Sequence, residues 1–187
     1  MAKLENNLKN FFLSMFLITA IVGAVLGGVY VLTEEPIAQA AAAKQEAAIK
    51  AVAPKFDSVG EAVVKTTENG EPAKIFPVML AGEEVGKAVQ VTTKKGFGGK
   101  VEVMFGFDKN NTITGYNVLM LNETPGLGSK MPDWFQLGGK SPVIGKNPGV
   151  DNLTVTKDGG SVDAITAATI SSRAFCDAIA QAYGLIK

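Results

Sequence analysis

A run of 22 uncharged residues, Phe11–Leu32, constrains what this chain can fold into more than any other feature. At about 1.5 Å per residue, a helix of that length crosses a hydrocarbon layer of roughly 30 Å. A cleaved signal peptide is the alternative, and Ala38-Gln-Ala40 resembles a cleavage site. The apolar region of a signal peptide is typically shorter, about 7–15 residues, and this site lies beyond an already long run. The sequence therefore predicts an uncleaved transmembrane helix over residues 11–32.

The charges beside this segment predict its orientation. Lys3 and Lys9 precede it, whereas Glu34 and Glu35 follow it. Basic residues concentrate on the cytoplasmic side of membrane helices. We therefore expect residues 1–10 in the cytoplasm of a bacterial cell. The chain after Leu32 is expected on the extracytoplasmic (periplasmic) side of the inner membrane.

The composition excludes several kinds of chemistry. The 18 basic and 18 acidic residues give a formal net charge of +0, which argues against nucleic-acid binding. The chain has no histidine, so it lacks imidazole bases and the commonest metal ligand. Its single cysteine, Cys176, can form neither an internal disulfide nor a metal site alone, and the pattern around it predicts a small buried residue. Redox chemistry in this protein would require an organic cofactor.

Beyond the apolar run, the chain reads as a stalk followed by one α+β domain. Thr33-Glu-Glu-Pro36 has the features of a helix start, and the alanine-rich stretch after it continues to Pro54, so residues 33–56 are expected to form a helical stalk. Segments rich in Val, Ile, Phe and Thr predict four strands: Ile75–Leu80, Val85–Thr93, Lys100–Phe107 and Ile113–Leu121. Their short connections predict an antiparallel meander, with flanking helices, within a domain of residues 57–187.

The stretch that opens the last helical segment is rich in small and hydroxylated residues. We expect this helix to begin near Thr166, with Thr169 and Ser171 in its first turn. A helix N-terminus offers unpaired N–H groups and the positive end of the macrodipole, which suit a phosphate. Ala167 and Ala168 would let a ligand approach the backbone. An ordinary helix start, with Thr166 as the N-cap, is the alternative.

A second candidate segment, Glu123–Gly128, follows the last predicted strand. Its Pro-Gly pair fits the centre of a type II turn that leaves backbone amides exposed. Apolar walls for a flat ligand are expected from Leu127, Met131 and Trp134, and polar contacts from Glu123 and Thr124. Lys140 and Ser141 are candidates for contacts with phosphate or ribityl oxygens.

Several motifs together resemble the RnfG/NqrC-type FMN-binding domain family. Asp163–Thr169 resembles its flavinylation motif, Asp-Gly-x-Ser/Thr-Gly-Ala-Thr, with alanines at the two glycine positions, Ala164 and Ala167. Three further segments resemble family sequences: Lys94–Gly99, Glu123–Gly128 and Trp134–Lys140. The motifs occur along this chain in the same order as in the family. The resemblance implies that FMN is attached covalently through its phosphate to Thr169. The expected site residues are Glu123, Thr124, Gly126, Leu127, Gly128, Lys140, Ser141, Asp163, Thr166, Ala167, Ala168 and Ser171.

The resemblance also implies a function. It points to a subunit of an Rnf-type complex that relays electrons between ferredoxin and NAD, coupled to Na⁺ or H⁺ transport. Such a subunit would work with other membrane and peripheral subunits, receive FMN from a flavin transferase, and have no catalytic activity alone. The C subunit of the Na⁺-translocating NADH:quinone reductase is one alternative, although its extramembrane region is typically longer. A membrane-tethered, non-redox ligand-binding module is the other.

Overall fold

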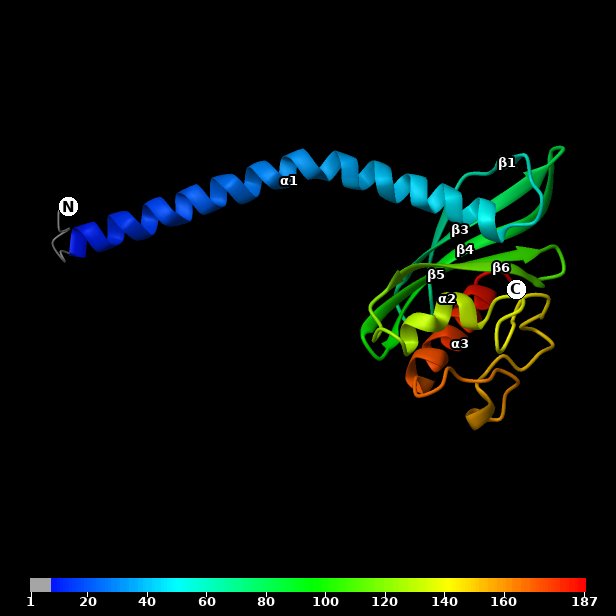
Figure 1. The fold of residues 1–187 in the computed structure, drawn as a ribbon. Helices are drawn as coiled ribbons and strands as arrows, with labels where there is room; N and C mark the ends of the chain where they lie inside the picture. Colours follow the sequence, from blue (N-terminus) through cyan, green and yellow to red (C-terminus); the bar gives the residue numbers. More distant parts are fainter. Residues whose placement is uncertain (1–7) are drawn as a thin grey trace. The chain divides into compact units, whose positions relative to one another are not determined.

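The computed structural model describes residues 8–187 (Figure 1); Lys3, used above to predict orientation, lies outside this range. The chain divides between Lys44 and Gln45 into two compact units. The helices are α1 (Leu8–Val52), the short η1 (Gly128–Lys130), α2 (Met131–Trp134) and η2 (Thr156–Asp158), and α3 (Thr169–Gly184). The strands are β1 (Ser58–Val59), β2 (Val63–Thr66), β3 (Pro72–Leu80), β4 (Glu83–Gly96), β5 (Gly99–Asp108) and β6 (Ile113–Leu121).

The first unit consists of α1 up to Lys44. Among residues 8–187, α1 is the one helix long and apolar enough to cross a membrane. Its apolar window has a mean hydropathy of 2.3, and none of that window is buried. The expected helix start at Thr33 is wrong, because α1 continues through Thr33 and Pro36. The Thr33 hydroxyl caps nothing; it donates to the carbonyl oxygens of Val29 and Tyr30, at 2.8 and 3.2 Å. In a helix interior this back-bonding satisfies the hydroxyl without ending the helix.

The second unit is built on a six-stranded antiparallel sheet. The strand order is β1-β3-β4-β5-β6, and β2 also pairs with β3. The four strands from β3 to β6 form the predicted meander, and the expected α+β fold is confirmed. The sequence did not predict β1 and β2, which are short and exposed along their length, so they lack the alternation of apolar and polar residues that marks a strand.

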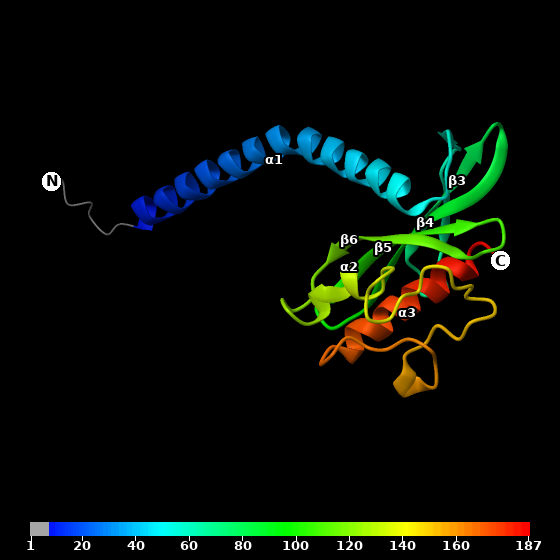
Figure 2. The same ribbon diagram turned by 45° about the vertical axis from the view of Figure 1, so that its right-hand side comes forward.

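Both faces of the sheet are covered, which explains why its central strands are so apolar. In β5, Phe105 and Phe107 face a core that includes Phe175 of α3, whereas Met104 faces a second core. The second core contains Ile49 and Val52, from the last turns of α1. A strand that is buried on both sides cannot alternate with polar residues. Figure 2 shows α3 lying along one face of the sheet.

Two glycines allow the end of α1 to approach the sheet closely. A Cβ on Gly106 would collide with the carbonyl oxygen of Val52. A Cβ on Gly115 would lie 3.0 Å from the Cα of Val52. The same carbonyl accepts a 2.7 Å hydrogen bond from the Thr114 hydroxyl. The last carbonyls of a helix lack partners within the helix, so this bond fixes the place where α1 ends.

The segment between β6 and α3 is mostly irregular but is firmly tied to the core. The Tyr116 hydroxyl, on β6, donates to the carbonyl oxygens of Met131 and Pro132 at 2.8 and 2.9 Å. The Phe135 ring stacks on Phe175 of α3, with centroids 4.3 Å apart and an interplanar angle of 6°. These contacts tie α2 and the residue after it to β6 and α3.

Candidate functional site

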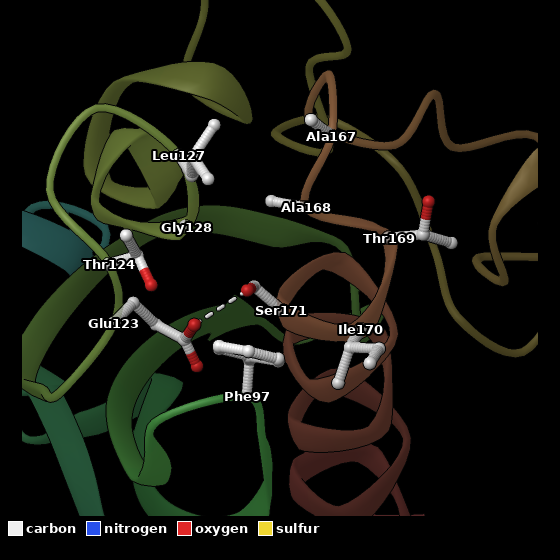
Figure 3. A pocket seen from close by; sticks show the side chains of 10 residues that line it. All are labelled: Phe97, Glu123, Thr124, Leu127, Gly128, Ala167, Ala168, Thr169, Ile170 and Ser171. Carbon is white, nitrogen blue, oxygen red and sulfur yellow. Dashed lines mark hydrogen bonds between the residues drawn. The ribbon is translucent and has the colours of Figure 1, made fainter.

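A cavity of about 320 Å³ lies where three segments meet: the β4–β5 loop, the turn after β6 and the start of α3 (Figure 3). Its lining is more apolar than polar. The lining residues are Phe97, Glu123, Thr124, Leu127, Gly128, Ala167, Ala168, Thr169, Ile170 and Ser171.

The β4–β5 loop reaches the cavity because it is rich in glycine. Gly99 has a φ of 100°, and a Cβ on Gly98 would collide with the carbonyl oxygen of Asn122. Only glycine is readily accommodated in such a conformation and at such a close approach. The tight loop presents Phe97, 68% exposed, at the edge of the cavity. Its ring is therefore accessible to a ligand in the cavity.

The turn after β6 has the predicted geometry. Gly126 has a φ of 76°, and the Leu127 N–H donates to the Thr124 carbonyl oxygen at 3.2 Å, as expected for a Pro-Gly type II turn. The turn presents Thr124 and Leu127 to the cavity, whereas Gly126 shapes the turn without lining it.

Glu123 and Ser171 join this turn to α3. Both side chains are buried, and the Ser171 hydroxyl donates to the Glu123 carboxylate at 2.7 Å. The other carboxylate oxygen accepts the Gly98 N–H at 3.3 Å, so one side chain links all three segments. A Cβ on Gly128 would lie 2.5 Å from Ser171 Oγ and 2.7 Å from Glu123 Oε2. The absence of a side chain at Gly128 therefore makes room for this pair, which forms a polar patch in the cavity wall.

The start of α3 differs from the expectation. The helix begins at Thr169 with Ala168 as its N-cap, and Thr166 is exposed in the preceding turn, so Thr166 is not the cap. Among residues 8–187 no side chain caps this helix end. The turn is held instead by Ser172, whose hydroxyl accepts the Ile165 N–H at 2.8 Å and donates to the Ala168 carbonyl oxygen at 3.0 Å. The first N–H groups of α3 are thus left without a side-chain acceptor.

Thr169 lies at the rim of the cavity. Its side chain points away from the Glu123–Ser171 pair (Figure 3), and its hydroxyl is 3.4 Å from the ammonium nitrogen of Lys157. The rim position leaves the hydroxyl accessible to another molecule. Ala167, two residues earlier, has a φ of 61°, in the left-handed region.

Eight of the predicted site residues line the cavity, and five do not. Those that line it are Glu123, Thr124, Leu127, Gly128, Ala167, Ala168, Thr169 and Ser171; those that do not are Gly126, Lys140, Ser141, Asp163 and Thr166. Ser141 is buried and accepts the Asp163 N–H at 2.8 Å, so both residues brace the turn before α3. Lys140 is exposed outside the lining.

The expected apolar walls are only partly correct. Leu127 lines the cavity, but Met131 is fully buried in the core and Trp134 donates from its indole nitrogen to the Asp163 carbonyl oxygen at 3.0 Å. Phe97 and Ile170 supply walls that the sequence did not predict. The available signal for Phe97 was its place in a glycine-rich loop, outside any apolar pattern. Nothing in the sequence distinguishes Ile170 from a core residue.

Cys176 is buried, as predicted, and burial raises the pKa of its thiol to about 12, with a smaller effect from the nearby Asp158 charge. A thiol with so high a pKa is largely unreactive at neutral pH. Within residues 8–187, no cluster of three or more His, Cys, Asp and Glu side chains could hold a metal ion. The cavity therefore depends on shape, hydrogen bonds and the start of α3 for any ligand that it binds.

Known proteins resemble this chain over the cavity and well beyond it. A family of FMN-binding domains matches residues 96–184, which include every residue that lines the cavity. The G subunit of the ion-translocating oxidoreductase complex of Yersinia pestis is 32% identical over 81% of this chain and 77% of its own length. The corresponding G subunits of Aliivibrio fischeri (strain ATCC 700601 / ES114) and Methanosarcina acetivorans are 31% and 32% identical, over 94% and 89% of this chain and 87% of their own lengths. The chain carries an FMN-binding domain and belongs to the family of G subunits of ion-translocating oxidoreductase complexes.

Proposed function

We propose that this protein is the FMN-carrying subunit of a membrane-bound, Rnf-type ion-translocating oxidoreductase, with FMN esterified through its phosphate to Thr169. The observation that carries the proposal is the position of Thr169: its hydroxyl lies at the rim of the cavity, at an uncapped helix start, inside the region that matches FMN-binding domains.

The cavity suits the isoalloxazine ring of a flavin. Ligand pockets typically have volumes of about 300–1,000 Å³. This cavity is open to solvent and has a volume of about 320 Å³. Phe97, Leu127 and Ile170 would hold the flat ring by apolar contact. Thr124 and the Glu123–Ser171 pair would provide polar contacts that orient the ring and influence its reduction potential.

The start of α3 suits the phosphate. Its unpaired N–H groups and the positive end of the helix dipole favour an anion at this position. Ala168 precedes Thr169 and adds only a methyl group, so the backbone remains accessible. The phosphate would lie at the rim and the ring in the cavity.

Attachment at Thr169 is a phosphoryl-group transfer. The threonine oxygen attacks the phosphorus of FAD that carries the riboflavin moiety, forming one P–O bond while the pyrophosphate P–O bond breaks. AMP leaves, and the hydroxyl proton passes to a base of the flavin transferase or to water. No histidine is needed on this chain, because the base would belong to the transferase or be water.

Bound FMN would supply one- and two-electron transfer, and the protein would hold it in place. A covalent bond prevents loss of the cofactor outside the cell, where free flavin is too dilute to keep a reversible site filled. Thr169 is in this account a tether and not a catalytic residue.

The remaining parts of the proposal concern the membrane and the partners. Residues 1–10 would lie in the cytoplasm, 11–32 in the bilayer, and the 33–56 stalk and 57–187 domain on the periplasmic side. Other components of the complex would pass electrons between ferredoxin and NAD through this flavin, and couple the transfer to Na⁺ or H⁺ movement.

The test is whether flavin remains on the protein after denaturation. The full-length chain is produced with and without an FAD-dependent flavin transferase, denatured, washed free of small molecules and examined by absorbance. We expect a flavin spectrum only with the transferase. A colourless chain in both cases would favour a non-redox binding module, and full loading without the transferase would show that attachment is autocatalytic.

A further inference from the structure

Lys157 lies beside Thr169 although twelve positions separate them in the sequence. Its ammonium group donates to the Thr169 hydroxyl at 3.4 Å. Lys157 is exposed and does not line the cavity. Within residues 8–187 its ammonium forms no ion pair with a carboxylate, so its charge is available to an anion at Thr169.

The neighbour of Lys157 fixes its position. Asp158 accepts two hydrogen bonds from Arg173, from Nε at 2.7 Å and from the terminal nitrogen at 2.6 Å. Arg173 lies one helical turn after Thr169, on α3. A bidentate pair between a guanidinium and a carboxylate fixes the relative orientation of the two side chains as well as their distance. The hydrogen bonds from Arg173 also keep the pKa of Asp158 below its usual value.

The segment that carries Lys157 is also held from its other side. Val155 and Val162 form a parallel bridge, and Gly159 ends η2 with a φ of 82°. A Cβ on Gly160 would collide with the Thr154 carbonyl oxygen, so the loop returns tightly on itself. Lys157 therefore projects from a braced turn toward the first residue of α3.

We propose that Lys157 is the cation that binds the phosphate at Thr169 and promotes its transfer, and that the Asp158–Arg173 pair positions it. The proposal rests on the proposed attachment of FMN to Thr169. During transfer from FAD, negative charge is spread over the non-bridging oxygens of the attacked phosphorus. A cation held beside the acceptor oxygen stabilises that charge, together with the N–H groups at the start of α3. Arg173 contributes less, because its charge is offset by Asp158.

The test follows the rate of flavin attachment. Full-length protein in detergent is incubated with FAD and a flavin transferase, and the flavinylated fraction is measured over time by intact mass. We expect Lys157→Gln to slow attachment about tenfold, as for loss of one charge-assisted hydrogen bond. Lys157→Arg should retain most of the rate. The matched control is Lys109→Gln, at the opposite end of β5 from the cavity, which should react as the unmodified chain does.

Ionic strength separates a charge effect from a change in shape. Salt screens a solvent-exposed cation, so the rate for the unmodified chain should fall as salt is added. For Lys157→Gln this fall should be smaller. The double variant Asp158→Asn/Arg173→Gln removes the pair without changing the net charge. It should slow attachment when Lys157 is present but have little further effect in the Lys157→Gln background, because the pair acts through Lys157.

Three outcomes would overturn the proposal: a Lys157→Gln rate equal to that of the control, equal salt dependence in the unmodified chain and Lys157→Gln, or an equal loss of rate in Lys157→Arg and Lys157→Gln. Thermal unfolding of each variant is measured in parallel, to detect any loss of the fold. Thr169→Val is included to separate the two proposals. An adduct on that variant would refute attachment at Thr169, whereas its absence together with normal rates for Lys157→Gln would refute the role of Lys157 alone.

Discussion

Ala167 adopts a left-handed backbone conformation, with a φ of 61°, in the turn that leads into α3. This conformation brings the Cβ of an L-residue close to the following carbonyl oxygen and costs about 1–2 kcal/mol, which glycine avoids. In the flavinylation motif that this segment resembles, glycine stands at this position. The chain therefore keeps the turn although its alanine strains it.

We predict that Ala167→Gly raises the free energy of unfolding by about 0.5–1 kcal/mol. Relief of the strained φ exceeds the cost of the extra freedom that glycine gives the unfolded chain, about 0.4–1 kcal/mol. Chemical denaturation of the two proteins measures the difference.

Ala164 offers a matched control, because it occupies the other glycine position of the motif but does not have a positive φ. Ala164→Gly should lower the free energy of unfolding by about 0.5–1 kcal/mol, since only the entropic cost remains. Equal effects at the two positions would show that backbone strain is not what distinguishes them.

At the residue scale, the sequence identified segments better than individual contacts. Glu123 and Leu127 were predicted because they lie within a recognisable motif, and Ser171 because it belongs to a hydroxyl-rich helix start; all three line the cavity. Thr166 was the N-cap in the alternative interpretation, by position alone, whereas in the structure Ser172 secures the turn from inside the helix. Lys157 could not be found, since twelve positions separate it from Thr169 and only the fold brings the two side chains together.

At the scale of elements, the buried pair Glu123–Ser171 couples the turn after β6 to α3. Ser171→Ala would leave one oxygen of a buried carboxylate without its hydroxyl donor. We predict a loss of about 1.5–3 kcal/mol in the free energy of unfolding, the usual range for a hydrogen bond to a charged group. Denaturant titration measures it.

Ser161→Ala is the control for this prediction, because Ser161 is exposed and its hydroxyl donates to the Asn152 carbonyl oxygen at 3.0 Å. Its loss should change stability by less than about 0.5 kcal/mol. If the two serine variants were equally stable, the buried pair would not couple the segments.

The strands of the meander were predictable because their composition and short turns are local signals. The predicted limits of β6, Ile113–Leu121, agree with the structure. Helix ends were less predictable, since long-range contacts decide them. The end of α1 depends on Gly106 and Thr114, on strands far along the chain, and no local feature of Thr33 shows that the helix continues through it.

For the whole molecule, the proposed orientation rests on Lys9 and Lys3 before the apolar run and on the acidic pair after it. We predict that protease added to sealed, right-side-out spheroplasts digests the domain beyond Leu32 and spares the N-terminus. A tag at each end, followed by immunoblotting, measures this. Protection of the 123–128 segment would place the domain in the cytoplasm, and the periplasmic relay role would fail.

Family membership could be inferred at this scale because several separated motifs occur in one order, which is far more specific than any one of them. The same resemblance indicated a subunit of a larger complex, but not the details of its chemistry. Neither the coupling ion nor the electron partners leave a pattern within this one chain.

The most direct test of the central claim is the intact mass of the Thr169→Val variant, produced together with a flavin transferase. Valine matches threonine in shape and lacks the hydroxyl, so the fold should be retained while the attachment point is lost. Thr154→Val, at an exposed threonine, serves as the matched control. We predict an FMN-sized increase in mass on the unmodified chain and on Thr154→Val, and none on Thr169→Val. The same increase on Thr169→Val would contradict the assignment of FMN to Thr169.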